Sequence, residues 1–264
     1  PSAYPSDMTM DFFTYAGAPG AYNLALGAGA GVWWKPGDFS ISTSYLSANG
    51  NKSCPNTNIC GDSAGGIGTD AAAFSATTQI AYAPENWGVA AAYTKASGTN
   101  GVGLYSGNGT RGAVALSLTD GQTNSYGLSA WWMPEESGWI PSISGGWGLT
   151  DISDSQLGYV KSATTQSWYV GLEWSDVFLE GNSFGIAAGQ PTFITDIDVD
   201  NKDDEQDYLH GGGYAWEFFY KFQVTDNITV TPAIHYLSAP FVNTQRGDNK
   251  LNAMSGLVKT TFKF

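Results

Sequence analysis

The residues best suited to hold a cation lie in one acidic run, "ITDIDVDNKDDEQDY", around residue 200. Asp196, Asp198 and Asp200 match the first spacings of a calcium-binding loop, but Asn201 stands where that loop needs glycine and Asp207 where it needs glutamate. We therefore interpret the run as a solvated acidic loop that attracts cations, with a bound divalent cation as the alternative and no other cofactor. Its acids are Asp196, Asp198, Asp200, Asp203, Asp204, Glu205 and Asp207.

Catalytic chemistry finds little support, because the chain has only two histidines, His210 and His235. Neither belongs to a Ser/His/Asp or Cys/His arrangement with a recognisable spacing. The two cysteines, Cys54 and Cys60, lie in "NGNKSCPNTNICGDSAGG", where two further metal ligands are lacking. This spacing favours a disulfide within a loop, formed in an oxidising compartment, over a metal site. The sequence predicts no enzyme.

Alternation of apolar and polar residues, the period of a β-strand, dominates the chain. In "YAWEFFYKFQ", for example, the aromatic residues at even positions alternate with Glu217, Lys221 and Gln223. Eleven segments of this kind predict an all-β protein with antiparallel strands, and "MDFFTYA" is a candidate for a twelfth strand. The eleven are residues 22–34, 38–48, 73–83, 87–95, 123–133, 139–150, 167–174, 182–191, 214–223, 227–238 and 254–264.

The connections between these segments alternate between short and long, which is typical of a barrel in an outer membrane. Aromatic pairs such as Trp33 and Trp34, or Tyr82 and Trp87, flank the short connections, where amphipathic rings favour a membrane interface. Short connections are centred near residues 36, 85, 135, 178 and 226, and long ones span 49–72, 96–122, 151–162, 192–212 and 239–252. A secreted carbohydrate-binding β-sandwich with a tryptophan-rich core is an alternative.

Composition agrees with a membrane protein that crosses the bilayer with strands. Only 13% of the residues are charged, about half the usual share in soluble domains. No run of about 18 apolar residues occurs, so a helical span is excluded. The net charge of −13 argues against nucleic acid as a partner. The sequence thus predicts a single transmembrane β-barrel domain over residues 1–264 with 11 or 12 strands.

Polar strand faces are expected to line the lumen of this barrel, because the aromatic faces point to lipid. The predicted pore lining carries both signs of charge, an arrangement that sets ion preference. For Lys263, snorkelling to the membrane interface is an equal alternative. The pore-lining candidates are Glu173, Glu217, Lys221, His235, Lys259 and Lys263.

The long connection 96–122 contains an apolar patch, "RGAVALSLTDG". An exposed loop has little reason to carry such a patch, so we expect the loop to fold into the barrel and narrow the pore. Arg111 and Asp120 would be its polar contributions. The alternative is an extension of the neighbouring strands above the membrane.

Three stretches, "PSAYPSDMTMDFFTYAGAPGAYNLALGAGAGVWW", "YAPENWGVAAAY" and "GLVKTTFKF", resemble cyanobacterial outer-membrane porins of the carbohydrate-selective porin family. The resemblance implies a barrel of sixteen strands, preceded by an S-layer-homology domain that binds the cell wall, and some members are labelled iron-uptake porins. This chain would then lack upstream strands and that domain. Phe264 with Phe262 resembles the terminal signal that the barrel assembly machinery reads.

Together these features predict an outer-membrane porin of a Gram-negative-type bacterium, by resemblance a cyanobacterium. It would pass small hydrophilic solutes and inorganic ions passively, with sugars or iron as candidate cargo. Expected partners are outer-membrane lipid, lipopolysaccharide bridged by divalent cations at the acidic loop, and two further copies in a homotrimer. A structural anchor that links the envelope to the cell wall is the main alternative.

Overall fold

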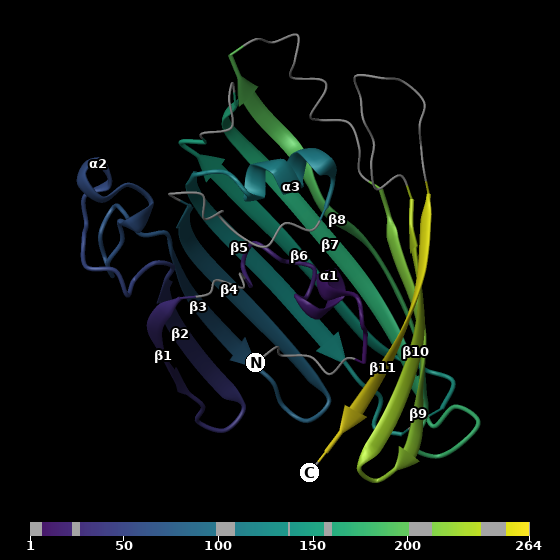
Figure 1. Ribbon diagram of the computed structural model, residues 1–264. Coiled ribbons are helices and arrows are strands. Elements are labelled where there is room, and N and C mark those ends of the chain that lie inside the picture. The colour runs from purple at the N-terminus through teal and green to yellow at the C-terminus, as the bar shows by residue number, and fades with distance from the viewer. Residues whose placement is uncertain are drawn as a thin grey trace.

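One antiparallel sheet of eleven strands makes up most of the computed structural model (Figure 1). The structure describes residues 7–22, 27–98, 109–136, 138–155, 160–200, 213–238 and 252–263. Each strand pairs with its neighbours in the sequence, from β1 at one edge to β11 at the other. The strands are β1 (Ala28–Trp34), β2 (Phe39–Ser47), β3 (Phe74–Tyr82), β4 (Trp87–Gly98), β5 (Gly121–Trp132), β6 (Ser142–Ser153), β7 (Val160–Ser175), β8 (Ser183–Val199), β9 (Ala215–Thr225), β10 (Ile228–Leu237) and β11 (Ala253–Phe262).

The predicted all-β antiparallel fold is confirmed, and its short turns gather at one end of the sheet (Figure 1). A β-sandwich consists of two sheets packed face to face. The described residues form one sheet only, so they do not fit that alternative. In that part β11 and β1 do not pair, so the sheet is open. The closed sixteen-stranded barrel stays a prediction.

The alternative twelfth strand in "MDFFTYA" is wrong. Asp11–Thr14 form a short helix, α1, which buries Phe12 and Phe13 together. A strand would have sent these two neighbouring rings to opposite faces. The backbone then turns at Ala16 and Gly17, both with positive φ.

The longest strands exceed their predicted lengths. β7 and β8 extend into the expected loops 151–162 and 192–212, so Asp196 and Asp198 lie on a strand. Burial of Ile194, Ile197 and Val199 beneath a helix explains the extension, because these side chains need a regular strand to reach that helix.

That helix is α3 (Arg111–Ser117). Thr110 caps its N-terminus, and the Thr110 hydroxyl accepts a hydrogen bond from the Ala113 N–H at 3.3 Å. The other helical turns are α2 (Thr57–Cys60) and η1 (Gly61–Ser63), beside the disulfide that joins Cys54 to Cys60. In the described residues, no helix combines the length and the apolar character needed to cross a membrane.

The curved sheet has two different faces. We call the concave face, against which α1 and α3 lie, the inner face, and the opposite one the outer face (Figure 1). Paired residues of neighbouring strands share a face, so the register assigns each position. In β4, for example, Ala90, Ala92 and Thr94 face inward and are buried, whereas Val89 and Tyr93 face outward and are exposed.

Candidate functional site

Two rows of aromatic pairs border the outer face. Near the short turns, the lower row contains Trp34 with Phe39, Tyr82 with Trp87, and Trp174 with Phe184, whose ring centroids lie 5.5–6.4 Å apart. Nearer the long connections, the upper row contains Tyr45 with Phe74, Tyr93 with Tyr126, and Trp168 with Tyr214, at 5.3–6.4 Å. Two such rows are the aromatic girdles that outer-membrane barrels place at their two interfaces.

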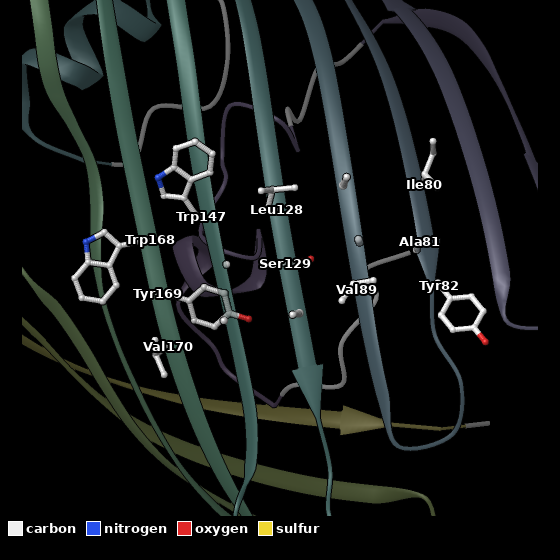
Figure 2. A pocket seen from close by; sticks show the side chains of 15 residues that line it. Ile80, Ala81, Tyr82, Val89, Leu128, Ser129, Trp147, Trp168, Tyr169 and Val170 are labelled. Atoms are coloured by element: carbon white, nitrogen blue, oxygen red, sulfur yellow. The ribbon is translucent and has the colours of Figure 1, made fainter.

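Apolar side chains fill the band between the two aromatic rows. Ile80, Val89, Leu128 and Val170 project from this part of the outer face and are 45–52% exposed (Figure 2). They border an open hollow of about 800 Å³ whose lining includes Ala91, Ala130 and Gly145. An exposed apolar band of this extent has the character of a surface that contacts lipid.

Polar atoms of aromatic residues in and beside the upper row have hydrogen-bond partners. The indole N–H groups of Trp147 and Trp168 donate to Gln166 and Gln190, each at 3.2 Å, and the Tyr93 hydroxyl donates to Asn124 at 2.8 Å. Amphipathic rings whose polar atoms are satisfied in this way suit the boundary between lipid and water.

The charged residues that were predicted to line the pore lie on the inner face. Glu217 pairs in register with His235, which pairs with Ser255, and Lys259 pairs with Thr231. Lys221 and Glu173 both lie beside Asp7. Beyond the end of β11, the Lys263 N–H donates to the Asn227 carbonyl at 2.9 Å, next to the turn between β9 and β10.

Residues 7–22, which we call the inner segment, run across this face from β11 and β9 to β4 (Figure 1). Asp7 forms an ion pair with Lys221, and its carbonyl accepts from Lys259 Nζ at 3.2 Å. At the far end, the Thr94 hydroxyl donates to the Ala21 carbonyl at 2.6 Å. Burial raises the pKa of the Tyr22 phenol.

Sequence reasoning missed the inner segment, although a signal for it exists. Tyr169 and Phe219 occupy inward positions, where a water-filled lumen would favour polar residues. In the structure they pack with Phe12 and Phe13 of α1 in a buried cluster, with the Phe13 and Tyr169 ring centroids 5.8 Å apart. Apolar residues on the face assigned to the lumen indicate that another part of the chain covers them.

The predicted constriction loop also reaches the inner face. Its apolar patch forms α3, and Ala113 and Leu116 are buried against inward residues of β6, β7 and β8. Asp120 lies between α3 and β5, while for Arg111 only its position at the start of α3 is described. The alternative, in which the strands simply extend, does not account for α3.

The acidic run is only partly described. Asp196 and Asp198 are exposed on β8, and Asp200 pairs with Lys161 at 2.7 Å. In the portion that the structure describes, no three His, Cys, Asp or Glu side chains gather as a metal site would require. Predicted residues that lie outside the described ranges are Asp203, Asp204, Glu205, Asp207 and Phe264.

An antiparallel sheet with a girdled apolar face outside and a charged face inside defines the wall of an outer-membrane β-barrel. The chain matches the carbohydrate-selective porin, OprB family over residues 20–264, and it belongs to that family. This is a family of channels rather than of enzymes, and its members indicate an outer-membrane location. The resemblance to cyanobacterial porins is thereby confirmed at the level of the family.

Two relatives are themselves described as uncharacterized proteins: alr4550 of Nostoc sp. and sll0772 of Synechocystis sp., both cyanobacterial. The first is 27% identical over 256 residues and the second 26% identical over 257. These matches cover 94% and 90% of this chain but 40% and 43% of the relatives, so the chain spans less than half their length. No solved structure matches the chain.

Proposed function

We propose that this chain forms wall strands of a porin through which small hydrophilic solutes and inorganic ions diffuse passively across a cyanobacterial outer membrane. The single observation that carries the proposal is the contrast between the two faces of one sheet. Outside, large apolar side chains such as Leu128 remain 52% exposed between aromatic rows, and inside, charged residues cluster. Membership of a porin family supports it.

Glu173, Lys221, His235, Lys259 and Lys263, together with the acidic run at the mouth, would bias which solutes enter. The sixth predicted lining residue, Glu217, is fully buried against residues 7–22 and does not meet solutes. Sugars are candidate cargo because of the family's description, and iron is a second candidate from the resemblance of the sequence. We propose three partners as well. The protein forms a homotrimer, divalent cations bridge it to lipopolysaccharide, and the barrel assembly machinery recognises Phe264.

The first test is single-channel recording of the purified protein in a planar bilayer under a KCl gradient. We expect stepwise ohmic openings with a reversal potential that favours cations, because the chain has a net charge of −13. A protein that inserts into the membrane and stays silent would instead favour the second candidate, an envelope anchor linked to the cell wall.

A further inference from the structure

We propose that the inner segment, residues 7–22, is the element that restricts this pore, and that Asp11 is the charge that an ion meets at the restriction. The inference rests on the proposed porin function and assigns the restriction to the residues that precede β1. Four features of the sheet are matched to this segment: a buried carboxylate, a set of inward glycines, an apolar patch and two hydroxyl donors.

Glu217 holds the start of the segment. Its carboxylate is fully buried and accepts the Thr9 N–H at 2.6 Å, the Thr9 hydroxyl at 2.8 Å and the Met10 N–H at 2.9 Å. His235 Nε2 lies 2.9 Å from the Thr9 hydroxyl, which links β10 to the same point. A buried carboxylate is stable only with such a set of donors, and each of these belongs to the segment.

Inward glycines make room for the segment. A Cβ on Gly146 would collide with the Ala16 carbonyl, one on Gly171 with Met8, and one on Gly148 would lie 2.8 Å from Ala18 Cα. Gly145, on the outer face, has 3.4 Å to its nearest atom and therefore no such reason to be glycine. Glycine is thus needed on the wall where the segment passes.

The segment is a fixed part of the wall, because apolar and polar contacts hold it along its whole length. Phe12, Phe13 and Ala16 bury themselves against Tyr169 and Phe219. The Ser167 hydroxyl donates to the Gly17 carbonyl at 2.6 Å, as Thr94 does to Ala21 further along. An element anchored at both ends and at its middle occupies space that the solute path would otherwise use.

Asp11 is the exposed charge of the segment. In the same segment Asp7 is paired with Lys221, whereas Asp11 is exposed and belongs to none of the ion pairs found among the described residues. It lines a cavity of about 520 Å³ together with Tyr214, His235 and Ser255. Its charge also acts on Tyr15, whose phenol has its pKa raised by burial and by this carboxylate.

The first experiment replaces Asp11→Asn and measures reversal potential in a KCl gradient. Removing one charge within about 7 Å of a passing ion should lower the preference for K⁺ over Cl⁻ by roughly twofold or more. Asp226→Asn, which removes the same charge at the short turn between β9 and β10, serves as the matched control and should shift it less. An Asp11→Asn channel with the reversal potential of the unaltered protein would overturn the assignment of Asp11.

The second experiment is Glu217→Gln. The side-chain NH₂ group then faces a backbone N–H group, of Thr9 or of Met10, that donates a hydrogen bond to the carboxylate in the unaltered protein. We expect the segment to loosen, the conductance to rise and larger poly(ethylene glycol) molecules to enter the channel. Glu85→Gln at a short turn is the control. Unchanged conductance and size limit in Glu217→Gln would overturn the role of the segment.

A disulfide between Ala21→Cys and Ala92→Cys, two residues that belong to one buried cluster and replace no glycine, provides the rescue. When oxidised in the Glu217→Gln background it should restore the original conductance, and reduction should raise it again. This outcome separates release of the segment from general damage to the wall. If Glu217→Gln fails to assemble, the two cysteines are placed in the otherwise unaltered protein. Oxidation should then leave its conductance unchanged, and a large fall in conductance would contradict the placement of the segment. Absence of any channel in the unaltered protein would refute the porin function itself.

Discussion

At the scale of single residues, glycine and carboxylate positions carry most of the information about the inner face. A buried Glu217 next to His235 looks unfavourable on a bare wall, and the donors of Thr9 and Met10 make it stable. Two glycines of the sheet differ in their surroundings: Gly171 faces inward against Met8, whereas Gly145 faces outward and has space beside it. This contrast gives a test in which the same substitution is made on both faces.

We expect Gly171→Leu to displace Met8 and the start of the inner segment, since overpacking of this kind costs about 1–3 kcal/mol. Conductance should increase, as in Glu217→Gln. Gly145→Leu adds the same side chain on the outer face, where it has room, and should leave conductance unchanged. Equal effects of the two substitutions in single-channel recordings would argue against contact between Gly171 and the segment.

At the scale of elements, α3 behaves as a second inward element of the wall. Leu116 of α3 is fully buried against the sheet, whereas Leu118, two residues on, is 64% exposed. The apolar patch in the connection 96–122 predicted inward folding, because apolar side chains leave water where a surface can cover them. The helical form was not predicted, since seven residues between glycine-rich stretches carry little periodicity.

Leu116→Asp should detach α3 from β6, β7 and β8, because it buries an unpaired charge. Trypsin should then cut after Arg111 in protein reconstituted in detergent, and conductance should change with it. Leu118→Asp places the same charge in water two residues away and should leave the cleavage pattern of the unaltered protein. Resistance of Leu116→Asp to trypsin would show that α3 does not depend on this contact.

At the scale of the whole molecule, the sheet is a wall between lipid and an aqueous face. Leu128→Lys puts a charge in the apolar band between the aromatic rows, and should cost about 2–4 kcal/mol near the bilayer midplane. We expect less folded protein in lipid vesicles, measured by the mobility shift of unheated samples on gels. Gln122→Lys, on the same face of β5 but near the long connections, should fold normally. A more soluble Leu128→Lys protein would instead point to a surface in water.

By itself the sequence determined the strands, the alternation of short and long connections and the outward aromatic positions, because alternation with period two and turn residues are local properties. Only the tertiary structure decided which element lies against the inner face. The contacts of Thr9 with Glu217 and of Gly17 with Ser167 join residues 208 and 150 positions apart. Partners at such separations leave no mark on local periodicity, whereas the fold brings them within a hydrogen bond of each other.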